Sequence, residues 1–166
     1  MTIASLLGRQ LYDVTVKSHP GVIAPPPLLF AGPWLGGLLL QRLLPLPRMP
    51  VAPRLAGPPL IAAGLGLGGW VIWTMQRAGT PVDPYEAPTA LVTAGPFRLT
   101  RNPAYVSLTL AYAGFSLLAG VLWSLLLLPG VLVAVDRGVV QREERYLEQH
   151  FGADYAQYRR RVRRWL

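Results

Sequence analysis

The feature that most constrains this chain is an uncharged stretch of 32 residues, from Ala104 to Val135. Two further apolar stretches run from about residue 25 to 45 and from about residue 55 to 76. A helix of about 20 apolar residues spans the roughly 30 Å hydrocarbon core of a bilayer, so each stretch is long enough to cross a membrane. Because 52% of the residues are apolar and only 14% are charged, the sequence predicts an integral membrane protein.

The long uncharged stretch can form one helix or two. As one helix it would be about 48 Å long, which is too long for a single span without strong tilt. Gly120 lies in the middle between Leu-rich halves, where a turn between antiparallel helices would fall, and residues up to Val140 can lengthen the second helix. We therefore predict a hairpin here, and an all-α integral membrane bundle of about four transmembrane helices.

The distribution of basic residues supports the hairpin. With four spans, the N-terminus, the loop at residues 77–103 and the C-terminal segment share one side, which holds 13 of the 16 Lys and Arg residues. Arg42, Arg48 and Arg54 lie on the other side, whereas three spans give a best split of 11 to 5. Lys and Arg concentrate in cytoplasmic loops, so we expect cytoplasmic termini and a multi-pass protein of a bacterial inner membrane.

Proline and glycine patterns characterise the first two spans. Four prolines between residues 45 and 53 predict an irregular loop between these spans rather than a helix. The glycine-rich run at residues 64–69 is similar to a nucleotide-binding loop, but it lies inside an apolar stretch. The spacing of Gly64 and Gly68 instead predicts close packing between membrane helices.

Past residue 135 the sequence becomes charged and amphipathic. It predicts a cytoplasmic segment with a helix over 137–150, a break at Phe151–Gly152 and a second helix over 153–163. Tyr155 and Tyr158 are three residues apart and share one face of that second helix.

Other patterns narrow the possible functions. Five arginines crowd residues 159–164, and we interpret them as a segment that lies against anionic lipid headgroups, with nucleic-acid binding as the alternative. Cysteine is absent, which excludes disulfides and thiolate sites, and the two histidines are far apart in the sequence. We therefore expect no metal site and no nucleic-acid partner.

Two polar segments flank the predicted hairpin, one ending at residues 101–105 and the other containing Glu143 and Glu144. A hairpin returns the chain to its starting side, so these segments would meet near the membrane surface. Asn102 can act simply as a helix cap, and the two glutamates can be a solvated helix face. Together, however, they predict a pocket for a zwitterionic, adenine-bearing ligand, because helix amides bind a carboxylate, a glutamate binds an ammonium group and aromatic rings bind a cation.

The segment GPFRLTRNPAY, followed by EERYL and FGADYAQYRRRVRRWL, resembles the membrane methyltransferases that include isoprenylcysteine carboxyl methyltransferase and the phospholipid methyltransferases. The resemblance covers residues 79–166 and implies a cofactor-binding core there, with residues 1–78 contributing spans to a single domain, 1–166. It implies S-adenosylmethionine as cofactor, S-adenosylhomocysteine as product, and a lipid-like or membrane-partitioned acceptor.

The resemblance also implies the residues of the site. Arg101, Tyr105, Glu143 and Glu144 would be catalytic, with one glutamate holding the methionine ammonium group. The cofactor contacts would be Thr89, Ala90, Leu91, Val92, Gly95, Phe97, Asn102, Pro103, Ala104, Tyr105, Glu143 and Glu144.

Two positions depart from the family pattern. Asn102 stands where the family more often has His, and Val139 stands where the prenylcysteine enzymes carry a substrate-contacting Arg. Arg137 and Arg142 are the candidates to replace that Arg. Carboxyl O-methylation, phospholipid N-methylation and methylation of a small thiol therefore all stay open, as does a non-catalytic membrane protein with the same fold.

Overall fold

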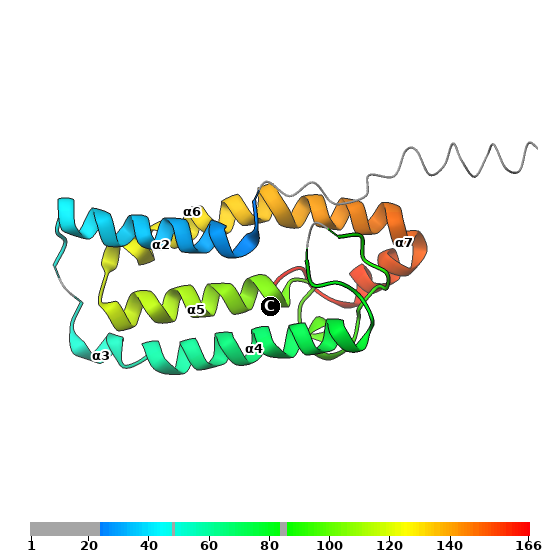
Figure 1. The fold of residues 1–166 in the computed structure, drawn as a ribbon, viewed down its shortest axis with the longest axis horizontal. Helices are drawn as coiled ribbons and strands as arrows, with labels where there is room; N and C mark the ends of the chain where they lie inside the picture. The colour runs from blue at the N-terminus through cyan, green and yellow to red at the C-terminus, as the bar shows by residue number, and fades with distance from the viewer. Residues whose placement is uncertain (1–23, 48, 84–85) are drawn as a thin grey trace, which may run out of the picture.

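The computed structural model describes residues 24–47, 49–83 and 86–166. Within these ranges the chain folds into helices and connecting loops, and the long helices run side by side (Figure 1). Their bounds are α2 (Pro26–Leu43), α3 (Val51–Arg54), α4 (Gly57–Arg77), the 3₁₀ turn η1 (Gly95–Arg98), α5 (Pro103–Ala119), α6 (Leu122–Val135), the π-helical turn η2 (Asp136–Val140) and α7 (Gln141–Arg161).

The break at Gly120 that the sequence predicts is confirmed. Gly120 follows α5 with a φ of 68°, in the left-handed region that glycine adopts without steric cost. Its N–H donates to the carbonyl of Leu117, and the N–H of Val121 donates to that of Ser116. These bonds cap α5, and the chain turns back into α6.

The end of the bundle that contains Gly120 also contains α3. Nη2 of Arg54 donates a 3.0 Å hydrogen bond to the carbonyl oxygen of Leu118, so α3 is tied to the last turn of α5. This short helix begins inside the segment for which we predicted an irregular loop, because prolines at a helix start need no backbone donor. Arg48, which we placed on the same side, lies outside the described residues.

Helices α4 and α5 pack closely through glycine. A Cβ atom added to Gly64 would lie 2.7 Å from the carbonyl oxygen of Ser107, and one added to Gly57 would lie 2.8 Å from that of Gly114. A Cβ added to Gly68 would lie 3.2 Å from Oγ of Ser107, a looser contact. The prediction that Gly64 and Gly68 serve helix packing is thus confirmed.

The core lies between α2, α5 and α6. The rings of Phe30 and Tyr112 meet edge to face with centroids 6.2 Å apart. The buried cluster around them also contains Tyr105, Val131, Val135, Val139 and Val140. The hydroxyl of Tyr112 donates to the carbonyl oxygen of Ser124, which satisfies the buried phenol.

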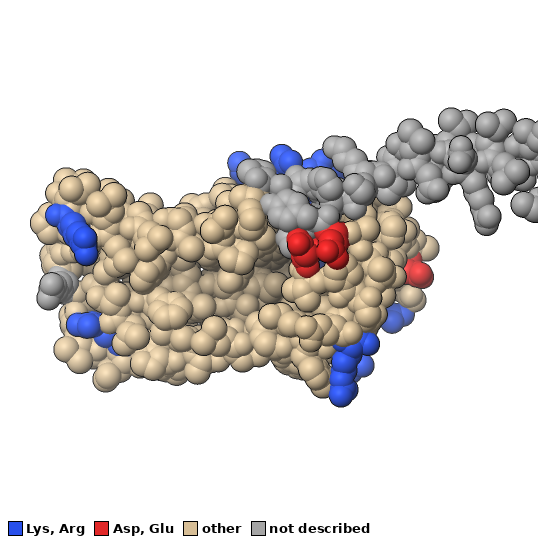
Figure 2. Space-filling view, in the orientation of Figure 1, with Lys and Arg blue, Asp and Glu red and all other residues tan. Residues whose placement is uncertain are grey.

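Many large apolar side chains of the described residues are exposed, among them Leu35, Trp73 and Leu126. Among the described residues, two helical segments are long and apolar enough to cross a bilayer, Val51–Arg77 and Leu122–Arg161, and α5 is a shorter apolar helix. The second segment combines α6, η2 and α7, and its uncharged part ends at Val135. Figure 2 shows that on this face Arg, Asp and Glu side chains lie at the left end and over the right half of the molecule, with an uncharged surface between them.

The C-terminal segment bends at Gly152, where φ is 50° and ψ is −116°. This confirms the predicted break. The preceding helix, however, does not begin separately at residue 137, because η2 continues α6 into α7 without interruption. Figure 1 shows that α7 turns back at this bend and brings the C-terminus to the start of α5.

Candidate functional site

A cavity of about 230 Å³ lies at the end of the bundle away from Gly120. Its wall is formed by the last turns of α4, the loop that follows, η1, the first turn of α5, and α7. The predicted site residues that line it are Ala90, Leu91, Val92, Phe97, Arg101, Asn102, Pro103, Ala104, Tyr105, Glu143 and Glu144. The fold thus brings together two segments that are about 40 residues apart in sequence.

Two predicted cofactor contacts lie outside this wall. Oγ1 of Thr89 donates to the carbonyl oxygen of Gly79, and its N–H donates to Oγ1 of Thr80. Gly95 has a φ of 57°, and a Cβ added there would lie 2.8 Å from Oγ1 of Thr74. Both residues shape the loop between α4 and α5.

Glu143 is held by one neighbouring hydroxyl. The Tyr105 phenol donates a 2.8 Å hydrogen bond to Oε1 of Glu143 and so connects α5 with α7. Burial raises the pKa of Glu143 to about 7, the Tyr105 hydrogen bond opposes this rise, and the nearby charge of Glu144 adds to it. Near neutral pH this carboxyl therefore changes its charge readily.

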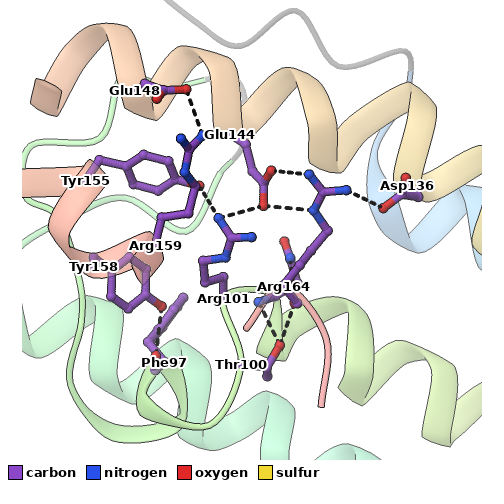
Figure 3. Close-up of polar contacts among 11 residues, drawn as sticks. Phe97, Thr100, Arg101, Asp136, Glu144, Glu148, Tyr155, Tyr158, Arg159 and Arg164 are labelled. Carbon is purple, nitrogen blue, oxygen red and sulfur yellow. Dashed lines mark hydrogen bonds and ion pairs between the residues drawn. The ribbon is translucent and has the colours of Figure 1, made fainter. Parts of the chain in front are cut away.

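Glu144 is paired with arginine on two sides (Figure 3). Nη1 of Arg101 lies 3.2 Å from Oε1 of Glu144, and Arg164 binds both carboxylate oxygens, at 3.1 and 2.6 Å. Arg164 also lies 3.6 Å from Oδ1 of Asp136. The hydrogen bond to Glu144 raises the pKa of Arg164. The hypothesis of a solvated glutamate face is wrong for Glu144, which is only 8% exposed.

Two arginines of the C-terminal run, Arg163 and Arg164, bind residues that line the cavity. The carbonyl oxygen of Arg163 accepts a 2.9 Å bond from the N–H of Arg101, and that of Arg164 accepts bonds from Thr100 Oγ1 and Asn102 Nδ2. We interpreted this run as a segment on lipid headgroups. For Arg164 that interpretation is wrong, because its guanidinium is bound to carboxylates within the protein.

Asn102 occupies the cap position of α5 without capping it through its side chain. Its amide instead donates a 2.9 Å bond to the carbonyl oxygen of Arg164, and the residue is buried in the cavity wall. The alternative of a simple side-chain helix cap is therefore wrong for Asn102.

Arg101 supplies the cavity with a second polar group, a guanidinium. Its Nε is buried and has no hydrogen-bond partner among the described residues. An unsatisfied buried donor costs about 1–3 kcal/mol, and the Arg101 side chain as a whole lines the cavity. Arg101 and Glu143 together give the cavity a donor for an anionic group and an acceptor for a cationic one.

Aromatic rings of α7 form a wall that the sequence prediction did not include. Tyr146, Tyr155 and Tyr158 line the cavity, and the rings of Tyr155 and Tyr158 lie 6.2 Å apart at 60°. The Tyr158 hydroxyl donates a 2.7 Å bond to the carbonyl oxygen of Phe97. The three-residue spacing correctly predicted that Tyr155 and Tyr158 share a face, and this face is turned toward the cavity.

The first half of the chain also contributes to the wall, through Pro26 of α2, the loop residues 80–83, and Val71 and Met75 of α4. Nothing in the sequence distinguishes Val71 and Met75 from the other apolar residues of α4.

The residues considered for substrate contact do not line this cavity. Val139 is fully buried outside the wall, and Arg137 and Arg142 do not line the cavity either. Within the described residues, no group of three or more His, Asp or Glu side chains could hold a metal ion.

Comparison with known proteins identifies the family. A family model described as phospholipid methyltransferase matches residues 53–154, which include both segments of the cavity that we predicted. An uncharacterized protein of Haemophilus influenzae is 43% identical over 35 residues, which are 21% of this chain and 56% of that protein, so the chain matches little more than half of this relative. No solved structure matches the chain. Because the family model covers more than half of the chain, the protein belongs to the phospholipid methyltransferase family.

Proposed function

We propose that the cavity binds S-adenosylmethionine and that the protein transfers its methyl group to a lipid-like acceptor. The observation that carries this proposal is that an acidic and a basic side chain line the same cavity. Glu143 offers a carboxylate and Arg101 offers a guanidinium group, and both residues line the cavity. A methionine moiety has an ammonium and a carboxylate, and it needs both of these contacts.

The two glutamates have different roles in this proposal. Arg101 and Arg164 already compensate the charge of Glu144, which makes it a structural anion that orients Arg101. Among the described residues, the hydrogen bond to Glu143 comes from the neutral Tyr105 hydroxyl. We therefore assign the ammonium group to Glu143.

The rest of the wall suits the remaining parts of the cofactor. The rings of Phe97, Tyr146 and Tyr155 can cover a sulfonium cation or an adenine ring, and residues 90–92 provide an apolar surface. Bound S-adenosylmethionine supplies a methyl group that is already activated, so the transfer needs no covalent help from the protein. The side chains have to hold the cofactor, align the acceptor and exclude water.

We also propose that α2, α4, α5 and α6 all cross the bilayer, with the cavity at the cytoplasmic end. The cofactor then enters from the cytoplasm and the acceptor from the bilayer. Reporter fusions at Gly120 and at the C-terminus should report opposite sides, with the C-terminus cytoplasmic. The same side for both fusions would contradict this topology.

For the acceptor we propose the primary amine of a phospholipid. The family match supports it, and so does the buried valine at position 139, where the resemblance places the substrate-contacting Arg of the prenylcysteine enzymes. The neutral amine, after losing a proton to water, forms the new N–C bond as the methyl–sulfur bond breaks and the electron pair stays on sulfur.

Two measurements on detergent-purified protein test the proposal. Calorimetry should show binding of S-adenosylhomocysteine by the wild type and by Arg160→Gln, an exposed control, and weaker binding by Glu143→Gln. Cofactor with a tritiated methyl group should label phosphatidylethanolamine in mixed micelles, but not a prenylcysteine or an alkyl thiol. Label in either of those compounds alone would contradict the amine acceptor. Absence of any binding would favour a non-catalytic protein with this fold.

A further inference from the structure

A second hollow lies along α5, α6 and the C-terminal tail, with a volume of about 670 Å³. Its sides are apolar and include Val106 and Leu110 of α5, Leu132 and Val133 of α6, and Trp165. No residue lines both this groove and the cofactor cavity. The two sites therefore lie on different surfaces of α5, and the groove is not part of the proposed cofactor site.

One end of the groove is charged. Asp136 and Arg137 line it, and they are the first charged residues after the apolar stretch of α6. Asp136 is compensated within the protein, since it accepts a 2.7 Å hydrogen bond from Gln141 and lies 3.6 Å from Arg164. Arg137 is exposed and has no ion pair with any described residue. The groove thus has apolar sides and one uncompensated cation at its end.

We infer that this groove binds one anionic phospholipid, with an acyl chain against α5 and α6 and the phosphate at Arg137. The charge step at residue 136 marks where an apolar helix leaves the bilayer core, which is the depth at which lipid phosphates lie. Trp165 borders the groove, and an indole ring suits this interfacial depth. A soluble anion would gain nothing from the apolar sides, whereas a phospholipid uses both parts of the groove.

The site can be tested without methyl transfer. Delipidated full-length protein in detergent is titrated with phosphatidylglycerol, phosphatidylcholine or diacylglycerol of identical chains, and bound lipid is counted by native mass spectrometry. The variants are Arg137→Gln, Arg160→Gln and Val133→Trp. Arg160 is exposed and outside the groove, so its substitution makes the same charge change elsewhere, and Val133 is 52% exposed, so a larger side chain there can enter the groove without repacking the core.

We expect one phosphatidylglycerol to bind more tightly than either neutral-headgroup control. Arg137→Gln should weaken it about fivefold, the effect of one basic residue near an anionic headgroup, and Arg160→Gln should not. Val133→Trp should weaken all three lipids, and no variant should change the affinity for S-adenosylhomocysteine. Equal losses in Arg137→Gln and Arg160→Gln would overturn the inference in favour of diffuse surface attraction. A wild-type dimer that Val133→Trp converts to a monomer would instead show that a second copy of the chain occupies the groove.

Discussion

The hydroxyl of Tyr105 donates to Oε1 of Glu143 over 2.8 Å, and this bond joins residues that are 38 positions apart in the sequence. The next residue, Glu144, binds Arg101 and Arg164 instead. Adjacent carboxylates therefore have different partners, one a neutral hydroxyl and the other two cations. This difference gives the two glutamates experimentally separable roles.

Substituting each glutamate by glutamine should separate these roles. Glu143→Gln removes the proposed partner of an ammonium group, a charged bond of about 1.5–3 kcal/mol, so affinity for S-adenosylhomocysteine should fall roughly ten- to hundredfold while the melting temperature changes little. Glu144→Gln leaves Arg101 buried without its counter-charge and should destabilise the protein by about 3–5 kcal/mol. Calorimetry and thermal melting in detergent measure both. Normal affinity in Glu143→Gln would contradict the assignment.

Cofactor affinity should depend on pH. The pKa of Glu143 is raised by burial to about 7, and only the carboxylate form attracts an ammonium group. Affinity for S-adenosylhomocysteine should therefore be highest above pH 7 and fall as the pH drops through 7, about tenfold between pH 8 and pH 6. Glu143→Gln is the control and should show a flat profile over this range. A wild-type profile equally flat would mean that Glu143 does not titrate there.

Tyr105→Phe should move this profile. The Tyr105 hydrogen bond favours the charged form of Glu143, so its loss should raise the pKa of that carboxyl further. The midpoint of the affinity profile should shift to higher pH, and affinity at pH 7 should fall. Above the new midpoint the affinity should return most of the way to the wild-type value, which a general loss of structure would not allow.

The C-terminal tail should stabilise the site through one arginine of a neighbouring pair. Arg164→Gln removes the bidentate bond to Glu144 and should lower the free energy of unfolding by about 1–3 kcal/mol, with weaker S-adenosylhomocysteine binding. Arg163→Gln is the matched control, because its side chain is exposed and only its backbone carbonyl binds Arg101. Equal effects in thermal melting and calorimetry would contradict a specific role for Arg164.

Glycine packing between α4 and α5 can be tested with two single methyl groups. Gly64→Ala places a Cβ 2.7 Å from the carbonyl oxygen of Ser107 and should destabilise the protein by about 1–3 kcal/mol, the usual cost of overpacking. Gly66→Ala meets nothing within 4 Å and should melt at or above the wild-type temperature. If both variants melt alike, the two helices do not approach as closely as described.

Local sequence signals predicted much of the fold. The length of the apolar stretches gave the long helices, and glycine at positions 120 and 152 marked the turn and the bend because both residues adopt positive φ. The short helix α3 was not predicted, since a run of prolines favours a loop and a single helical turn at its end leaves no periodic pattern.

Residues of the site could be predicted only where they lie in a sequence motif. Glu143 and Tyr105 lie in motifs with family-like spacing, and both line the cavity. The partners of Glu144 were not predictable, because Arg164 reaches it only after the chain bends at Gly152 and returns. Met75 was missed for a similar reason, since only tertiary packing brings the end of α4 to the cavity.

The π-helical turn at Asp136–Val140 has a consequence for how α7 presents its side chains. Such a turn holds about one residue more than an α-helical turn, and each residue rotates a helix by about 100°. The face that carries Glu143 is thus set by the length of this turn as well as by the identity of the side chains. A chain of this family with one residue more or fewer in this turn would present a different face of α7 to the cofactor cavity. Sequence alignments across the turn should therefore pair residues that lie on the same face of the helix, and not only residues at the same count along the chain.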